Sequence, residues 1–338
     1  MSAITISLCM IVKNEEQVLG RCLDSIADLM DEIVIVDTGS TDRTKEIAAR
    51  YTDQIYDFEW VDDFSAARNF AFSKAHMDYI YSADADEVLD EENRKRYRIL
   101  KDTLLPEIEI VQMKYSNQLQ FGTVYNFDEE YRPKLFKRLR EFEWQDPIHE
   151  SIRLDPVVYD SDIVIIHMPQ CSHAGRDLAN FRKQTERGVR LSAHLHEMYA
   201  RELFVAGNEE DFLAAEGYFA EASKDVSRSH KEFTESCCVA ARAARLRGDS
   251  ETFFKYAMKL TAGEGCAEIC SELGDFYLYR RDYEEAAVWY YNAAYETEAV
   301  IALSAATTRP LQGLVAAYEA LGLEEQAELY RNECAKIG

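Results

Sequence analysis

The stretch "EIVIVDTGSTDRTKEIAARY", residues 32–51, decides the fold of the first part of the chain. Its opening run of isoleucine and valine is typical of a strand that is buried on both faces of a parallel sheet. Asp37 follows this run, and residues 41–51 are predicted to form a helix. A strand that passes into a helix within a few residues is the building unit of a parallel α/β sheet.

The same unit occurs on both sides of this stretch. Further strands are predicted at 4–12, 54–60 and 78–84, and further helices at 15–30 and 63–75. Strands and helices that alternate with short gaps require parallel strands joined by right-handed crossovers, so we expect a doubly wound sheet. Ligands of such sheets bind at the carboxyl ends of the strands, and the polar residues that follow each strand are therefore the candidate site.

The pattern changes near residue 107. Polar and apolar residues then alternate in four runs, which predict mixed or antiparallel strands added to the parallel core, at 107–118, 133–138, 148–154 and 162–168. From about residue 177 the chain is predicted to be helical to its end. We therefore expect an α/β domain at 1–175 and an all-α domain at 176–338.

The helical tail contains a repeat. Segments that start at Asp211, Asp249, Asp282 and Leu323 align with one another, and their starts lie 38, 33 and 41 residues apart. Three columns agree and form one stripe along a helix, namely Ala215, Phe253, Ala286 and Ala327, then Tyr218, Tyr256, Trp289 and Tyr330, then Ala222, Leu260, Ala293 and Cys334. The stretch 273–294 resembles a tetratricopeptide repeat, whose period is 34 residues. We interpret the stripe as core between stacked helices, and the stack can also present a concave surface to a protein or peptide.

Composition narrows the class of protein. The 338 residues carry 38 Lys and Arg against 62 Asp and Glu, a formal charge of −24, which disfavours nucleic acid and anionic lipid as partners. An anionic small substrate is compatible with this charge, because a bound divalent cation or a local basic pocket reverses the field in one cleft. Eight cysteines are scattered without CxxC pairs, and no apolar run is long enough for a signal sequence or a membrane span. We therefore expect reduced thiols and a cytoplasmic protein.

Three polar clusters follow predicted strands, "KNEE" at 13–16, "DTGSTD" at 37–42 and "DADE" at 84–87, and a fourth, "ARN" at 67–69, lies in the helix after the third strand. In this order and at these distances, the blocks "CMIVKNEE", "VDTGSTDRT", "SAARNFAFSKA" and "SADADE" resemble glycosyltransferase family 2, whose catalytic domain has the GT-A fold. The resemblance covers roughly residues 4–175. Tetratricopeptide-like helices after such a domain are also familiar among bacterial members, including some that glycosylate proteins or peptides.

The "DADE" cluster carries the strongest chemical signal. Asp84 and Asp86, one residue apart at the end of a strand, can both reach a single divalent ion, and the ion then bridges the pyrophosphate of a sugar nucleotide. A hard cation with oxygen ligands also removes the repulsion among the clustered acids. The alternative is that the cluster only caps the next helix. The resemblance favours the first interpretation, a DXD motif that holds Mn²⁺ or Mg²⁺.

The other clusters take their roles from the resemblance. It implies that Asp37 contacts the nucleoside, commonly uridine, while the alternative is that Asp37 only caps the turn after its strand. It places Asn14 and Glu15 among the residues that contact the nucleotide. Arg68 and Asn69 are expected to hydrogen-bond the nucleotide or its phosphates. For Arg68 the alternative is a structural salt bridge to the acid cluster.

Inverting displacement at the anomeric carbon also needs a carboxylate that takes the proton of the acceptor. In the GT-A fold this base follows the added strands, near "EFEWQDPIHESI", so Glu150 is our first candidate and Asp146 our second. An ordinary loop carboxylate is the alternative for either. Some proteins of this fold supply a late histidine as an extra metal ligand, for which His173 is the first candidate and His167 the second. A lone histidine near a strand end is otherwise a hydrogen-bonded polar residue.

The resulting hypothesis is a metal-dependent inverting glycosyltransferase. It would move a hexose or an N-acetylhexosamine from a UDP-sugar to a protein, peptide or glycan acceptor, and a homodimer through the helical domain is expected because solenoid ends need capping. The alternative is a tetratricopeptide scaffold whose first domain binds nucleotides without turning them over. A nucleotidyltransferase is a third reading, but it favours a glycine-rich phosphate loop after the first strand, which "MIVKNEEQ" lacks.

Overall fold

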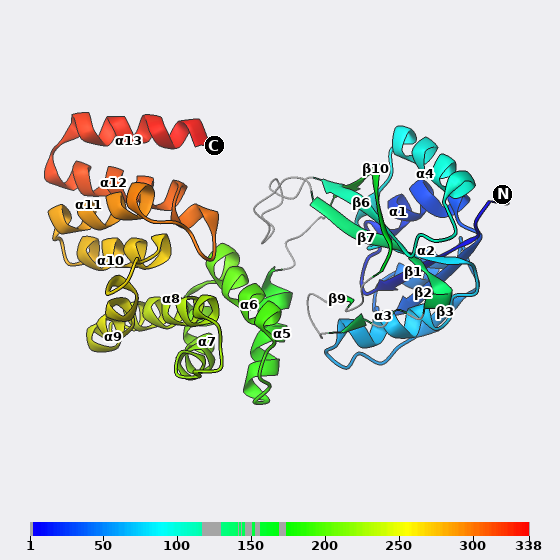
Figure 1. Ribbon diagram of the computed structural model, residues 1–338, viewed down its shortest axis with the longest axis horizontal. Helices are drawn as coiled ribbons and strands as arrows, with labels where there is room; N and C mark the ends of the chain where they lie inside the picture. The colour runs from blue at the N-terminus through cyan, green and yellow to red at the C-terminus, as the bar shows by residue number, and fades with distance from the viewer. Residues whose placement is uncertain are drawn as a thin grey trace. The chain divides into compact units, whose positions relative to one another are not determined.

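The computed structural model describes residues 3–116, 130–140, 142, 144–145, 151–152, 156–168 and 174–337. The chain divides into two compact units, Met1–Ser172 and His173–Gly338 (Figure 1). The first unit is built on a twisted sheet with helices on its faces, and the described part of the second unit is helical throughout. This arrangement confirms the fold class expected from the sequence, a mixed α/β sheet followed by an all-α region.

The first unit has an eight-stranded sheet in the order β3-β2-β1-β4-β7-β6-β10-β5. Strands β3, β2, β1 and β4 run parallel, and β7 lies antiparallel between β4 and β6. A separate two-stranded ladder joins β8 and β9. The strands are β1 (Ile6–Val12), β2 (Glu32–Asp37), β3 (Ile55–Asp57), β4 (Tyr79–Ser82), β5 (Glu87–Val88), β6 (Ile110–Ser116), β7 (Glu130–Lys137), β8 (Trp144–Gln145), β9 (Ser151–Ile152) and β10 (Val158–His167).

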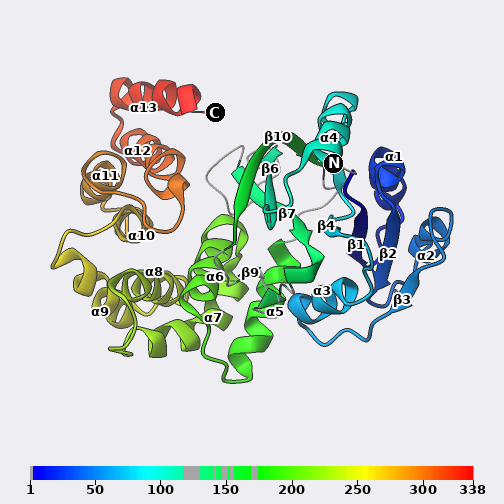
Figure 2. The same ribbon diagram turned by 45° about the vertical axis from the view of Figure 1, so that its right-hand side comes forward.

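Helices cover both faces of this sheet. They are α1 (Leu19–Ile26), α2 (Thr44–Ala48), α3 (Phe64–Phe72) and α4 (Glu91–Thr103). On one face Leu8 of β1 shares a core with Leu23 of α1 and Tyr97 of α4. On the other face its neighbour Cys9 shares a core with Phe72 of α3. Alternate residues of β1 thus enter two cores, which is why the strand is apolar throughout, and α3 lies across the sheet from α4 (Figure 2).

The structure differs from the sequence-based expectation at several element ends. The helix predicted over 15–30 begins only at Leu19, and the one predicted over 41–51 covers Thr44–Ala48. The segments before these two helices hydrogen-bond each other, since Asp42 Oδ2 accepts from the N–H of Glu16 and Glu16 Oε2 accepts from the N–H of Arg43. These bonds hold the two segments outside the helices. The "DADE" cluster does not cap α4, because the short strand β5 intervenes and Asp90 accepts the capping bond from the N–H of Asn93 at 2.8 Å.

The second unit consists of paired helices. After α5 (Ala174–Glu186), neighbouring helices pack as the pairs α8 with α9, α10 with α11, and α12 with α13, with further contacts between α7 and α8 and between α11 and α12. Helix α6 packs against α8, and its Tyr199 ring also contacts Phe219 of α7, with the ring centres 5.2 Å apart. The bounds are α6 (Ala193–Ala206), α7 (Glu209–Ala222), α8 (His230–Leu246), α9 (Ser250–Thr261), α10 (Ala267–Tyr279), α11 (Tyr283–Tyr291), α12 (Thr308–Leu321) and α13 (Glu324–Ile337). Among the described helices, none is long and apolar enough to cross a membrane.

The repeat found in the sequence corresponds to every second helix, α7, α9, α11 and α13. The first of the three columns is fully buried at all four positions, Ala215, Phe253, Ala286 and Ala327. This confirms that the first column of the stripe is core between stacked helices, whereas Tyr218, Trp289, Tyr330 and Cys334 of the other columns are half-buried. The turn before the second helix adopts a positive φ in three hairpins, at Gly248, Arg281 and Gly322, a conformation in which a helix commonly ends.

Candidate active site

The carboxyl ends of β1, β2 and β4 meet at one edge of the sheet, because these strands are parallel neighbours. Asn14 follows β1, Asp37 is the last residue of β2, and Asp84 follows β4 by one residue. The polar clusters found in the sequence are therefore gathered at the edge where ligands of doubly wound sheets bind.

Asp37 is completely buried and serves the turn that follows it. Its Oδ1 accepts hydrogen bonds from the N–H groups of Gly39 at 3.0 Å and Ser40 at 2.9 Å, and Lys45 Nζ lies 3.8 Å from the same oxygen. Its Oδ2 is buried and accepts no hydrogen bond from any residue in the described part of the chain. A buried carboxylate oxygen without a donor is costly, so one oxygen caps the turn while the other is available to a ligand.

Asn14 and Glu15 tie the first tip loop to the second. Asn14 adopts a positive φ of 56°, its Oδ1 accepts from the N–H of Thr41 at 2.8 Å, and its own N–H donates to Ser40 Oγ at 2.9 Å. The N–H of Glu15 donates to Thr44 Oγ1 at 2.7 Å. These bonds fix the loop that carries both residues beside the turn after Asp37.

Asp84 lies next to a cation from helix α3. Arg68 Nη2 is 3.8 Å from Asp84 Oδ1, and Arg68 Nη1 donates to Ser82 Oγ at 2.6 Å. The Asp84 side chain is 44% exposed, whereas that of Arg68 is 12% exposed. Desolvation raises the pKa of Asp84, but the charges of Lys134 and Arg68 outweigh it and hold this pKa below its usual value. The salt bridge considered for Arg68 is thus present, and Asp84 is an ionised carboxylate that is open to solvent.

Asp86 lies against the end of β10. His167 Nε2 is 3.2 Å from Asp86 Oδ2, and the His167 ring packs on Tyr115 of β6 with the ring centres 5.1 Å apart. Only 12% of the Asp86 side chain is exposed. His167, our second candidate for a late histidine ligand, is therefore in contact with Asp86, one of the two acids of the acid pair, Asp84 and Asp86.

The sequence analysis gave no separate role to two charged residues near Asp84 and Asp86. Glu87 and Lys134 form a buried ion pair, Lys134 Nζ with Glu87 Oε1, and their side chains are 2% and 7% exposed. Burial raises the pKa of Glu87 to about 7, although Lys134 opposes that rise. The sequence offered one indication of this ion pair, because Lys134 lies between apolar residues in the strand predicted over 133–138. A charged residue inside a buried strand needs a partner of opposite charge.

Arg68 and Asn69 also hold Trp144 of β8. The Arg68 guanidinium carbon is 4.7 Å from the centre of a Trp144 ring, which is a cation–π contact. Asn69 Nδ2 donates to the carbonyl oxygen of Trp144 at 2.9 Å, and the N–H of Trp144 donates to Asn69 Oδ1 at 2.8 Å. The amide of Asn69 is thus engaged at both ends with backbone, and the described contacts favour a positioning role for it.

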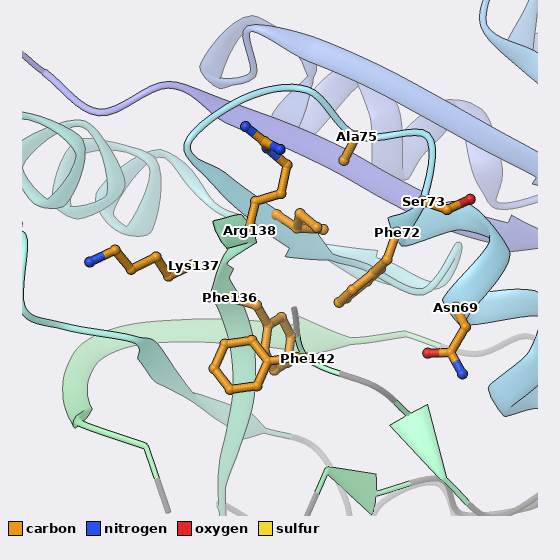
Figure 3. A pocket seen from close by; sticks show the side chains of 9 residues that line it. Asn69, Phe72, Ser73, Ala75, Phe136, Lys137, Arg138 and Phe142 are labelled. Carbon is orange, nitrogen blue, oxygen red and sulfur yellow. The ribbon is translucent and has the colours of Figure 1, made fainter. Parts of the chain in front are cut away.

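A cavity of about 360 Å³ lies beside the central strands β4 and β7, where Ile80 pairs with Phe136. Figure 3 shows the side chains of Phe72, Phe136 and Phe142 close together in its lining. The complete lining is Asn69, Phe72, Ser73, Ala75, Ile80, Phe136, Lys137, Arg138 and Phe142. No carboxylate of the strand tips belongs to it, so this cavity is separate from the acid cluster.

Three predicted site residues, Glu150, Asp146 and His173, lie outside the described residues. Within the described ranges, no group of three or more His, Cys, Asp or Glu side chains is arranged to hold a metal ion. Asp84 and Asp86 nevertheless fit a Mg²⁺ or Mn²⁺ ion of the kind that takes one or two carboxylates from the protein and its other oxygens from substrate phosphates and water. The open position of Asp84 agrees with such a shared site.

Comparison with known proteins finds a family match within the first unit. Residues 7–149 match the family model described as "Glycosyl transferase family 2". A TPR repeat-containing protein of Synechococcus elongatus is 34% identical over 149 residues, which is 44% of this chain and 35% of that protein. The SPbeta prophage-derived glycosyltransferase SunS of Bacillus subtilis is 25% identical over 248 residues, which is 68% of this chain and 55% of that protein. The chain thus spans about a third and about half of the length of these two relatives.

Among solved structures, the chain is similar to glucosyl-3-phosphoglycerate synthase from Mycobacterium tuberculosis in complex with Mn²⁺, uridine diphosphate and phosphoglyceric acid. The sequence identity is 16%, the TM-score is 0.41, and the match covers 60% of this chain and 79% of that one.

Proposed function

Residues 7–149 form a glycosyltransferase family 2 domain, and from that premise we propose that the protein is a metal-dependent inverting glycosyltransferase. It would move a hexose or an N-acetylhexosamine from a UDP-sugar to an acceptor, for which a protein or peptide is our first choice. The observation that carries the proposal is the gathering of Asp37, Asp84 and Asp86 at one edge of the sheet, with Arg68 beside Asp84.

Each residue of this group has a task in the proposed reaction. The buried Oδ2 of Asp37 would accept a hydrogen bond from the base or ribose of the donor. Asp84 and Asp86 would hold Mn²⁺ or Mg²⁺, which when bound neutralises the charge of the departing diphosphate. Arg68, a cation 3.8 Å from Asp84, would pair with a phosphate oxygen.

The transfer itself is a displacement at the anomeric carbon. A hydroxyl, thiol or amide group of the acceptor forms the new bond while the bond to the diphosphate oxygen breaks, so the configuration inverts. The acceptor proton passes to a carboxylate on the opposite face of the sugar, and Glu150 and Asp146 are the candidates. Uridine diphosphate leaves with the electron pair of the broken bond.

Release of uridine diphosphate tests the proposal. The protein is incubated with UDP-glucose or UDP-N-acetylglucosamine and Mn²⁺, with water as the acceptor, and the released nucleotide is measured. We expect slow release that EDTA stops and that Asp86→Asn lowers at least about tenfold, because the cation loses a charged ligand. Glu92→Gln, at an exposed acid on α4, is the control and should leave the rate unchanged.

Calorimetry accompanies this assay, because water is a poor acceptor. Binding of uridine diphosphate that strengthens with Mn²⁺ in the normal protein and not in Asp86→Asn supports the proposal. If the affinity for uridine diphosphate does not depend on Mn²⁺ and no UDP-sugar releases uridine diphosphate, the alternative is favoured, a scaffold with a non-catalytic nucleotide-binding domain. Pyrophosphate produced from UTP would indicate nucleotidyl transfer instead.

A further inference from the structure

Lys134 is a buried cation on a central strand of the sheet, and it pairs with the acid that follows Asp86. It lies on β7, the strand between β4 and β6, and its side chain is 7% exposed. Its ammonium pairs with Glu87 Oε1 and lies 5.2 Å from the ring centre of Tyr115. Burying an ammonium group destabilises the folded protein unless a negative charge compensates it. The ion pair with Glu87 supplies that compensation.

That partner belongs to the segment that carries the acid pair. We call residues 84–87 the acid segment, since three of its four residues are carboxylic acids. Glu87 ends the segment and pairs in β5 with His167 of β10, whose ring contacts Asp86. The ion pair therefore links the end of the acid segment to a central strand 47 residues away in the sequence.

We propose that Lys134 is a positioning residue that holds the acid segment in its cation-binding conformation by supplying a fixed positive charge through Glu87. The inference rests on the proposed function, because it takes the acid pair to be a cation site. Lys134 would not itself touch the donor or the cation.

The physical reason lies in the charge balance before any ligand arrives. Asp84, Asp86 and Glu87 are close enough to repel one another, and a cation is present only once it has bound. Arg68 approaches from α3 on the Asp84 side, and Lys134 anchors the other end of the segment. Two protein cations from different elements thus hold a segment that would otherwise spread to separate its charges, and an ordered segment binds a cation without a cost of ordering.

Cation affinity gives the test, because it reports on the segment and not on turnover. Binding of Mn²⁺ in the presence of saturating uridine diphosphate is measured at pH 8 by electron paramagnetic resonance of free Mn²⁺. We expect Lys134→Met to weaken Mn²⁺ binding about tenfold or more, a loss of about 1.4 kcal/mol, and Lys134→Arg to stay within about threefold of the normal protein. Lys137→Met, at the exposed end of the same strand where Nζ bonds the Pro106 carbonyl, is the matched control and should not change the affinity.

The sign of the effect separates positioning from simple electrostatics. Removing a nearby positive charge should by itself tighten the binding of a cation, so unchanged or tighter Mn²⁺ binding by Lys134→Met would overturn the inference while the proposed function stands. If the wild-type protein does not bind Mn²⁺ in the presence of uridine diphosphate, both the proposed function and this inference are contradicted. Thermal unfolding of each variant shows that the measured protein is folded.

A second variant covers the case in which Lys134→Met does not fold. In the double variant Lys134→Met with Glu87→Gln, neither buried residue is charged, so the core has no uncompensated ion. Because Lys134 acts through Glu87, we expect the double variant and the single variant Glu87→Gln to bind Mn²⁺ with similar affinity, each about tenfold or more weakly than the wild-type protein. Wild-type affinity in either folded variant would contradict the inference.

Discussion

At the scale of single residues, Asp37 shows how one side chain can serve structure and ligand together. Its two oxygens have different surroundings, since Oδ1 accepts two backbone hydrogen bonds and Oδ2 accepts none from the described residues. Both interpretations offered by the sequence are therefore compatible with one carboxylate. The turn needs an acceptor on one side, and a nucleoside donor group would satisfy the other.

Asp37→Asn tests the second of these tasks. The amide preserves the shape and can keep its oxygen on the turn, but it then presents an NH₂ group where the carboxylate oxygen was. We expect the affinity for uridine diphosphate, measured by calorimetry, to fall about tenfold or more, with little change in the unfolding temperature. Asp57→Asn is the control, because Asp57 also pairs with Lys45 but is 78% exposed. A normal affinity in Asp37→Asn would exclude contact with the nucleoside.

At the scale of helices and strands, a charged cluster joins three helices of the second unit. Glu272 of α10 is fully buried and lies between Arg245 of α8 at 2.6 Å and Arg309 of α12 at 2.6 Å. Asp275, one turn further along α10, contacts the same two arginines. Burial raises the pKa of Glu272, but the charges of Arg309, Arg245 and Arg242 outweigh it and lower the pKa to about 2.

Glu272→Gln should strongly destabilise this cluster. The neutral amide leaves buried arginines with one carboxylate where there were two, and breaking a buried pair in this way costs about 3–5 kcal/mol. Urea unfolding of the full chain measures the loss, and Glu325→Gln on the exposed start of α13 is the control. A loss below about 1 kcal/mol would show that water compensates the arginines.

At the scale of the whole molecule, buried acids link stability to pH. Burial raises the pKa of Glu202 and of Glu235 to about 8, and both carboxylate oxygens of Glu235 accept no hydrogen bond from the described residues. The folded chain therefore holds protons that the unfolded chain has released. Their stabilising contribution is complete below the unfolded pKa of about 4.3 and is lost as the pH rises through 8.

The unfolding temperature should consequently fall between pH 6 and pH 8.5, by about 5 °C. Glu235→Gln mimics the protonated form at every pH, so this variant should lose less stability over that interval and should exceed the normal protein at pH 8.5. Scanning calorimetry measures both quantities, and Glu210→Gln on the exposed face of α7 is the control. An unfolding temperature that rises across this interval would contradict the raised pKa values.

Much of the fold follows from local sequence. The apolar runs and helical periodicities predicted the parallel strands, the polar residues that follow them and the helical second unit. These features could be predicted because the patterns depend on residues that lie within a few positions of one another. The candidate site residues at the ends of β2 and β4 followed from the same rule, since parallel strands bring their carboxyl ends to one edge.

Tertiary structure alone decided which distant residues meet. Lys134 reaches Glu87 because β7 inserts antiparallel between β4 and β6, and Asn69 bonds Trp144 across 75 residues of sequence. The choice of neighbouring strand depends on packing and chain connection over the whole sheet and not on local propensity. The sequence by itself therefore determined the elements and the acids at their ends, and the assembled sheet determined the cations that surround those acids.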